Sequence, residues 1–298
     1  MAVATATSPR RSAGRRLSDL LYGRTKLQLA GLLAGPLGWL VIAYLGSLAV
    51  LLVAAFWQLD SFTGAIVKQP TLDNFRTIVE TDVYRKIALR TIGIAAAVTV
   101  TDALLAFPIA FFMAKVASRR VRLALAVGVL MPLWAAYLVK VYAWRVMLSE
   151  DGIINWALQP LGLHGPGYGN VAVWLVMSYL WLPYMILPIY AGLERIPNSL
   201  LDASGDLGGR PWTTFRRVIL PMAFPAVIAG SIFSFSLTLG DYITPQLVSS
   251  TQFIGNVVYA NVGVANNLPL AAAFATVPVV VMVIYLLVAR RLGAFEAL

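Results

Sequence analysis

Long apolar stretches alternate with shorter polar connections along this chain. A helix that crosses a bilayer needs about 20 mostly apolar residues, and six stretches reach that length. Helices are required there because lipid offers no hydrogen-bond partner to the backbone of an open strand. We therefore predict an all-α, polytopic membrane protein with six transmembrane helices. The predicted spans are residues 37–57, 91–114, 123–147, 171–193, 218–239 and 270–289.

The composition agrees with the lipid bilayer as the surrounding medium. Hydrophobic residues make up 59% of the 298 positions and charged residues 12%, whereas soluble domains carry about 25% charged residues. The net charge of +10 would suggest nucleic acid if it formed a soluble patch, but the basic residues lie in short clusters between apolar runs. We expect no nucleic-acid partner. Without cysteine and with the single histidine His164 in a Gly/Pro-rich loop, we also expect no metal site.

The basic clusters predict the sidedness of the spans, because Lys and Arg near span ends are retained in the cytoplasm. They lie in the N-terminal tail, in the connections 115–122 and 194–217, and at Arg290 and Arg291, whereas connections 148–170 and 240–269 hold neither Lys nor Arg. Both termini are therefore expected in the cytoplasm. The first span has basic residues before it, as a signal peptide does, but its apolar run is too long and we interpret it as a retained anchor.

The chain is expected to divide into four parts. Residues 1–36 form a cytoplasmic tail and the entry to the first span, and the composition up to about Gly23 predicts disorder. The first helix, 37–57, is followed by an extracytoplasmic connection, 58–90. That connection is amphipathic enough around Phe75 and Ile78 to form a surface helix. Residues 91–290 form the core transmembrane domain.

The connection 194–217 predicts a compact elbow at the membrane surface. Pro197 favours the start of a short helix capped by Asn198 or Ser199, and Gly208 with Gly209 stops it. Pro211 permits a second helix to begin at once. Such an elbow is either an ordinary connector or a shape that docks into a groove of another protein.

The spacing of this elbow resembles the EAA loop of ABC importer permeases, whose pattern is Glu-Ala-Ala, Gly, then Ile-x-Leu-Pro. Here the pattern is Asp202-Ala203-Ser204, three residues, Gly208, nine residues, then Val218-Ile219-Leu220-Pro221. Asp202, Ser204 and Val218 depart from the family residues, and the spacing is kept. The resemblance implies the type I ABC importer permease fold and a coupling helix that inserts into an ATPase subunit. The implied coupling residues are Ser199, Leu200, Leu201, Asp202, Ala203, Ser204, Asp206, Leu207, Gly208, Leu220 and Pro221.

No GxxxxGK[ST] phosphate loop occurs in the chain, so we expect ATP and Mg on a partner ATPase dimer and no cofactor on this chain. The stretches 71–75, 107–111, 131–134 and 240–248, with Tyr142, resemble the spermidine/putrescine class of permeases, and within it the first of two dissimilar permeases. This resemblance implies a second permease, an extracytoplasmic solute-binding protein, a bacterial inner membrane and a polyamine as substrate.

A few polar and aromatic residues inside the spans are candidates for the substrate pathway. Asp102 and Lys140 either pair to fix helix packing or act in the pathway, since a charge at mid-span costs about 3 kcal/mol. Asp241 either receives a cationic substrate or caps a turn with Tyr242 and Thr244. The pathway candidates are Asp241, Tyr242, Trp134, Tyr137, Asp102 and Lys140.

Two other classes of protein remain as alternatives. A secondary transporter or channel usually needs intramembrane acids that form a complete pathway, or inverted repeats, and neither is evident here. A membrane-embedded enzyme needs a nucleophile with a base or a metal site, which one histidine and no cysteine do not supply. The sequence therefore favours a transport subunit that is not itself an enzyme.

Overall fold

The computed structural model describes residues 25–60 and 62–294, and the chain divides into two units, 1–53 and 54–298. The tail expected to be disordered, up to about Gly23, lies outside the described residues. The first unit contains one continuous helix, formed by α2 (Thr25–Leu40), a π-helical segment η1 (Val41–Gly46) and α3 (Ser47–Ala54). Its apolar stretch, Leu29–Ala54, is long enough to span a membrane. The predicted first span, 37–57, is confirmed as a helix, although the helix passes through Pro36 and ends at Ala54.

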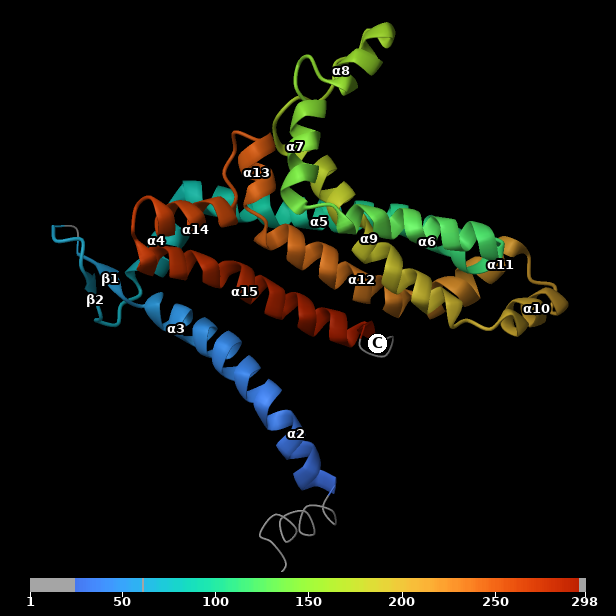
Figure 1. Cartoon of the computed structure of the whole chain (residues 1–298), viewed down its shortest axis with the longest axis horizontal. Coiled ribbons are helices and arrows are strands. Elements are labelled where there is room, and N and C mark those ends of the chain that lie inside the picture. The colour runs from blue at the N-terminus through green and yellow to red at the C-terminus, as the bar shows by residue number, and fades with distance from the viewer. Residues whose placement is uncertain (1–24, 61, 295–298) are drawn as a thin grey trace, which may run out of the picture. The chain divides into compact units, whose positions relative to one another are not determined.

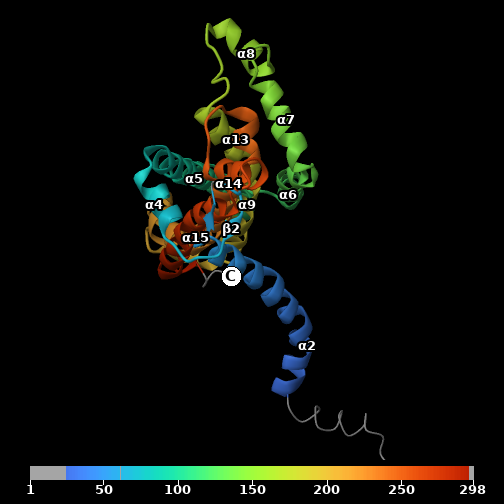
Figure 2. The same ribbon diagram turned by 90° about the vertical axis from the view of Figure 1, so that its left-hand side faces the viewer.

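Three long helices form the centre of the second unit (Figures 1 and 2): α5 (Asp82–Phe111), α9 (Asn170–Glu194) and α12 (Leu220–Gly240). A fourth, α15 (Leu268–Arg291), packs beside α12 and α14 (Ile254–Gly263). Small residues let α9 and α12 approach closely, since a side chain on Gly192 would begin 2.3 Å from Cβ of Ala226. Close packing of small residues is typical of helices that associate within lipid.

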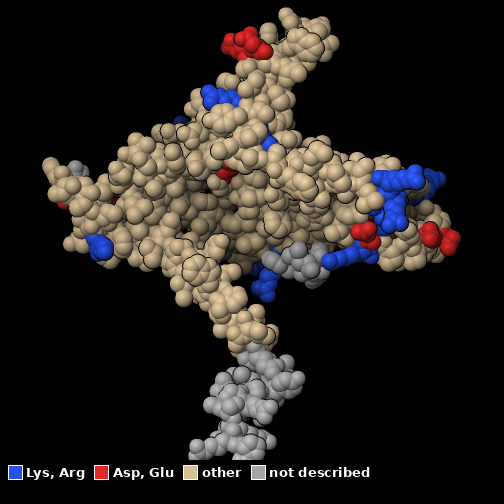
Figure 3. All heavy atoms as spheres, in the orientation of Figure 1, with Lys and Arg blue, Asp and Glu red and all other residues tan. Residues whose placement is uncertain are grey.

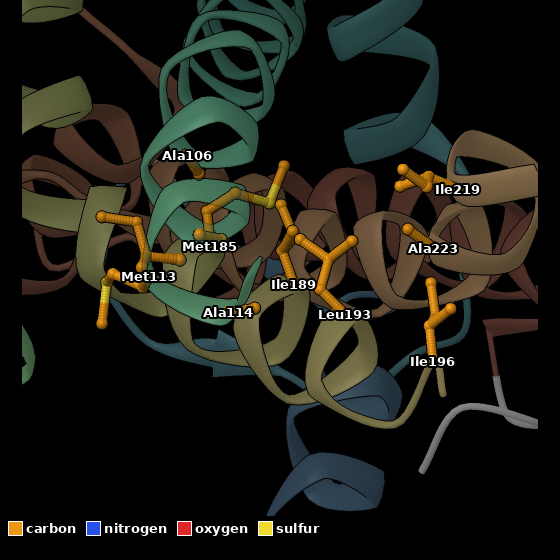
Figure 4. Packing of buried hydrophobic residues seen from close by; sticks show 11 residues of the cluster. Ala106, Met113, Ala114, Met185, Ile189, Leu193, Ile196, Ile219 and Ala223 are labelled. Carbon is orange, nitrogen blue, oxygen red and sulfur yellow. The ribbon is translucent and has the colours of Figure 1, made fainter. Parts of the chain in front are cut away.

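A buried cluster joins these helices at the end of the unit that carries the elbow. Figure 4 shows its side chains converging from α5, from α9 and from the start of α12. Contacts of this kind fix the end of each helix against its neighbours. The buried members are Ala106, Ala110, Met113, Ala114, Met185, Ile186, Ile189, Leu193, Ile196, Ile219 and Ala223.

Four further predicted spans are confirmed as helices, with some differences in length. The second, 91–114, is part of a longer helix that begins at Asp82 and continues through the π-helical segment η2 (Phe112–Val116). The fourth, 171–193, agrees with α9 to within one residue at each end. The fifth, 218–239, corresponds to α12 together with the preceding π-helical segment η4 (Phe215–Ile219), and the sixth, 270–289, to α15.

The third predicted span, 123–147, is not one straight helix. It consists of α6 (Arg119–Trp134) and α7 (Tyr137–Met147), which are bent by 94°. Ala135 and Ala136 between them have extended backbone angles, so the helical hydrogen bonds stop there. The described chain therefore holds five helices able to span a membrane, or six if this bent pair is one span.

The connections carry short elements. Strands β1 (Gln58–Leu59) and β2 (Ile66–Val67) form an antiparallel hairpin, which corrects the all-α expectation at this one place. The expected surface helix is present as α4 (Asp73–Glu80), with Ile78 buried. The remaining elements are α8 (Ile153–Leu158), η3 (Gln159–Leu161), α10 (Asn198–Asp206), α11 (Pro211–Thr214) and α13 (Ile243–Val248).

Candidate functional site

The elbow predicted from the sequence is formed by α10 and α11. Gly208 ends the first of these helices with φ of +78°, a left-handed conformation that favours glycine. The amide of Gly209 donates to the Ser204 carbonyl at 2.8 Å, and the Ser204 and Thr214 hydroxyls are 2.8 Å apart. These bonds tie the two short helices to each other. The expected cap by Asn198 or Ser199 is wrong, because Pro197 takes the capping position and no side chain bonds there.

One face of the elbow packs against the long helices of the second unit, and the other face is exposed. Phe215, directly after α11, packs edge-on against Phe107 and Phe111 of α5 with ring centroids 5.7 and 6.4 Å apart. Leu201 packs on the buried cluster. In contrast, Leu207 is 90% exposed and Trp212 is also exposed. An exposed apolar face on a rigid support is typical of a surface that another protein covers.

Two polar contacts that the sequence analysis missed hold the start of the elbow. Lys115, at the end of η2, donates through Nζ to the Ile196 carbonyl at 2.6 Å and lies 3.4 Å from Oδ1 of Asn198. Arg122 and Glu194 form an ion pair at 3.5 Å. We name the Lys115 bond to Ile196 the α9 clasp. Its two residues are 81 positions apart, so no local pattern indicates it.

Basic side chains gather at the same end of the second unit. Figure 3 shows Lys and Arg over the region where α6 begins and α11 lies. The patch includes exposed residues at the start of α6 and on either side of α11, namely Arg119, Arg120, Arg210, Arg216 and Arg217. Such clusters favour a surface close to anionic lipid headgroups.

At the opposite end of α12, a cavity of about 410 Å³ has aromatic walls. Tyr137 and Trp181 stack with centroids 6.1 Å apart, and Tyr242 stacks on Tyr259 at 4.9 Å. We name this cavity the aromatic pocket. Its lining is Tyr137, Trp181, Ser236, Leu237, Gly240, Asp241, Tyr242 and Ile243.

The carboxylate of Asp241 lies at the edge of the aromatic pocket and accepts four hydrogen bonds. Its Oδ1 accepts from the amides of Ile243 and Thr244, at 2.9 and 3.1 Å. Its Oδ2 accepts from the hydroxyls of Tyr137 and Thr244, each at 2.6 Å. The capping role considered for Asp241 is therefore present at the start of α13. Thr244, which the capping alternative placed in this turn, bonds Asp241 through both its amide and its hydroxyl.

The other pathway candidates lie elsewhere. Asp102 is fully buried in α5, where its Oδ2 accepts from Ser234 of α12 at 2.6 Å and its Oδ1 has no partner among the described residues. It does not pair with Lys140 in this structure. The suggested pairing assumed a straight third span, and the bend before α7 invalidates that assumption. Trp134, at the end of α6, is 90% exposed and does not line the aromatic pocket.

A second, open cavity of about 920 Å³ lies along α8, where His164 is part of its loop lining. The side chain of Asn155 holds this loop, accepting from the Gly165 amide at 2.6 Å and donating to the Ser149 carbonyl at 3.0 Å. Within residues 25–60 and 62–294, no group of three or more His, Cys, Asp or Glu could hold a metal ion.

Helix α12 connects the anchored elbow to the aromatic pocket within a set of apolar helices long enough to span a membrane. Residues 95–294 match the family described as the binding-protein-dependent transport system inner membrane component, and the chain belongs to this family. It is a multi-pass inner-membrane permease subunit of an ABC importer, and not an enzyme or a secondary transporter.

Particular relatives support the same class. The chain is 45% identical, over the whole of both proteins, to the inner membrane ABC transporter permease protein YdcU of Escherichia coli. It is 29% identical to the spermidine/putrescine transport system permease protein PotB of Escherichia coli, over 85% of this chain and 94% of the relative.

Solved structures share the fold. A chain of a bacterial alginate ABC transporter, in complex with an alginate pentasaccharide-bound periplasmic protein, aligns with a TM-score of 0.75 and 15% identity. That alignment covers 95% of this chain and 98% of the other. A second structure of a bacterial ABC transporter involved in alginate import aligns with a TM-score of 0.69.

Proposed function

We propose that this permease forms one half of a translocation pathway for a polyamine of the spermidine/putrescine kind. The observation that carries this proposal is the Asp241 carboxylate at the edge of the aromatic pocket. Among the ion pairs of the described residues none includes Asp241, and the connection 240–269 holds no Lys or Arg. A carboxylate next to aromatic faces attracts an ammonium group by charge and by cation–π contact. The names of the PotB relatives support the same substrate class.

The proposed topology has six spans and cytoplasmic termini in a bacterial cytoplasmic membrane. The basic patch near the elbow supports a cytoplasmic elbow, because Lys and Arg concentrate on that side. The bent pair α6 and α7 then serves as the third span. The aromatic pocket, at the other end of α12, opens toward the extracytoplasmic side.

The elbow is proposed to dock into a partner ATPase dimer, which binds ATP and Mg. Support comes from its exposed apolar face, its rigid Gly208 turn and its anchor on α5. ATP-driven closure of the dimer would move the elbow and rock the helices attached to it. The proposed coupling residues remain Ser199, Leu200, Leu201, Asp202, Ala203, Ser204, Asp206, Leu207, Gly208, Leu220 and Pro221.

Two other partners complete the proposed importer. A second, dissimilar permease would supply the other half of the pathway, as the likeness to PotB suggests. An extracytoplasmic solute-binding protein would deliver the substrate. The family description, which names binding-protein-dependent transport, supports that partner.

Reconstitution tests the proposed substrate. The complete transporter in proteoliposomes, supplied with its binding protein and internal ATP, should accumulate radiolabelled putrescine or spermidine. Uptake should stop without ATP. If neither polyamine is accumulated while another solute stimulates ATP hydrolysis, the polyamine proposal is wrong and the permease class is unaffected.

A further inference from the structure

Three oxygen atoms lie together where two helix breaks meet. Tyr137 begins α7 after the extended Ala135 and Ala136, and Asp241 precedes α13 directly after α12 ends. Oη of Tyr137 lies 2.6 Å from Oδ2 of Asp241 and 2.8 Å from Oγ1 of Thr244, and that Oγ1 lies 2.6 Å from the same Oδ2. We name these three atoms the oxygen triangle. Figures 1 and 2 show α7 and α13, which contribute two of its residues, side by side.

The oxygen triangle has three close contacts but only two hydrogens to fill them. Each hydroxyl has one hydrogen, and an ionised carboxylate has none. The amides of Ile243 and Thr244 bond the other carboxylate oxygen, Oδ1, so they add no hydrogen here. One of the three contacts is therefore always an oxygen pair without a hydrogen between its atoms. Such a pair is repulsive unless an outside donor bridges it.

Thr244 allows the empty contact to face the pocket. It is fully buried, whereas Tyr137 and Asp241 both line the aromatic pocket. In this structure both hydroxyls donate to Oδ2 of Asp241, so the Tyr137–Thr244 contact is the one without a hydrogen. The Tyr137 hydroxyl can instead turn its hydrogen to Oγ1 of Thr244, and the Tyr137–Asp241 contact is then left without a hydrogen. Two acceptors with a net negative charge then lie next to the cavity.

We propose that the Tyr137 hydroxyl and the Asp241 carboxylate form a subsite for a primary ammonium group, with Thr244 as the residue that directs the Tyr137 hydrogen away. A primary ammonium brings three N–H donors and no acceptor, which matches an acceptor pair that lacks a hydrogen. The faces of Trp181 and Tyr242 border the adjoining methylene chain. This inference rests on the proposed polyamine function and adds the two atoms, Oη of Tyr137 and Oδ2 of Asp241, that bind one primary ammonium end. A quaternary ammonium, which has no N–H, is rejected.

The test compares two probes that differ in N–H donors. The permease–ATPase complex in nanodiscs, without the binding protein, is titrated with 1,4-diaminobutane and with its bis(trimethylammonium) analogue. Binding is followed by saturation-transfer-difference NMR. The native complex should prefer the diamine by at least about tenfold, because a site built for hydrogen bonding rejects an analogue without donors. Omitting the binding protein ensures that its own selectivity does not contribute.

Conservative variants separate this role from packing. Tyr137→Phe keeps the ring against Trp181 and removes only the hydroxyl, and Thr244→Val removes the hydrogen relay. Each should reduce the preference to less than about threefold, and Thr244→Ser should restore it. Tyr179→Phe and Thr276→Val, outside the pocket, serve as matched controls and should keep the native preference.

The outcomes distinguish the two proposals. If the native complex binds neither probe, the subsite is overturned, while uptake of polyamine by the reconstituted transporter with its binding protein decides the polyamine function separately. If the native complex prefers the diamine and both Tyr137→Phe and Thr244→Val keep that preference, the polyamine function remains and the subsite is overturned.

Discussion

At the scale of single residues, Asp241 shows how one side chain combines two roles. Its Oδ1 caps α13 through two backbone amides, while its Oδ2 faces two hydroxyls at the pocket edge. Asp102 differs, because it is fully buried between α5 and α12 with Ser234 as its only hydrogen-bond partner in the described chain. We interpret Asp102 as a contact between helices, since this conformation gives it no access to the aromatic pocket.

Asp241→Asn separates charge from capping. The amide oxygen of asparagine still accepts from the two backbone amides. Its NH₂ group donates to the hydroxyls, which then act as acceptors instead of donors. We expect the fold to survive and the apparent affinity for polyamine to fall roughly tenfold at low salt, as expected from loss of a charge at about 4 Å. The difference from the native protein should narrow as salt screens the charge. The measurement is uptake into proteoliposomes across a salt series.

Asp60→Asn provides the matched control for that variant. Asp60 also accepts two backbone amides, from Phe62 and Thr63, and these bonds lower the pKa of its carboxyl. It lies in the β1–β2 turn and does not line the pocket. Uptake by Asp60→Asn should equal that of the native protein. If Asp241→Asn also shows native affinity at every salt concentration, Asp241 acts only as a cap.

At the scale of elements, α12 joins the elbow to the aromatic pocket. Its 21 residues span about 30 Å at 1.5 Å per residue, which is the thickness of the hydrocarbon core. The elbow precedes it through η4, and Asp241 follows it. A continuous helix therefore connects the elbow to the pocket, and a movement of the elbow would be transmitted along it.

Gly208→Val tests the elbow turn. Gly208 has φ of +78° and open space around its missing Cβ, so the cost of the substitution is conformational, roughly 1 to 2 kcal/mol. We expect weaker co-purification of the ATPase and reduced uptake, with normal membrane insertion. Gly64→Val, in the β1–β2 turn with φ of +66° and equally open, is the control and should keep native co-purification and uptake. Native transport and co-purification in Gly208→Val would contradict the docking role.

Lys115→Met tests the α9 clasp. Methionine has a similar length but does not donate to the Ile196 carbonyl, so the elbow should move more independently of η2. We expect the ATPase to remain bound, while the number of substrates carried per ATP falls several-fold. Lys115→Arg should recover part of that ratio. Lys86→Met, which loses only an exposed ion pair with Asp82, is the control. An unchanged ratio in Lys115→Met would refute the role of the clasp.

At the scale of the whole molecule, this chain is expected to act as one part of a larger assembly. The exposed face of α5 carries apolar residues such as Val100 and Leu104. Lipid or another permease could cover such surfaces equally well. The proposed pairing with a second, dissimilar permease would cover part of them.

Cross-linking tests that pairing. Because the native chain has no cysteine, single-cysteine variants such as Leu104→Cys place a reactive group at one chosen position. Cross-linking in native membranes should join this chain to a second, dissimilar permease, identified by mass spectrometry. The cysteine-free chain is the control and should give no product. If only dimers of this chain form at every exposed position tested, the heteromeric pairing is wrong.

The sequence alone determined the features that depend on local free energies. The apolar length of each stretch predicts a helix in lipid, and the bounds of α9 agree with the prediction to within one residue. The turn at Gly208 was also predictable from the sequence, because few residues other than glycine adopt a positive φ. The spacing of the elbow also indicated the permease family.

Tertiary structure decided the features that join distant parts of the chain. Hydropathy measures the free energy of transferring each residue into lipid and carries no information on backbone angles. It therefore did not predict the 94° bend at Ala135 and Ala136. Tyr137 and Asp241 are 104 positions apart, and Asp102 and Ser234 are 132 apart. Such partners are selected by how the helices pack, and many pairings are compatible with the same pattern of spans. The sequence therefore predicted three residues of the aromatic pocket, namely Asp241, Tyr242 and Tyr137. Only the packing of α7 against α13 decided that they lie together.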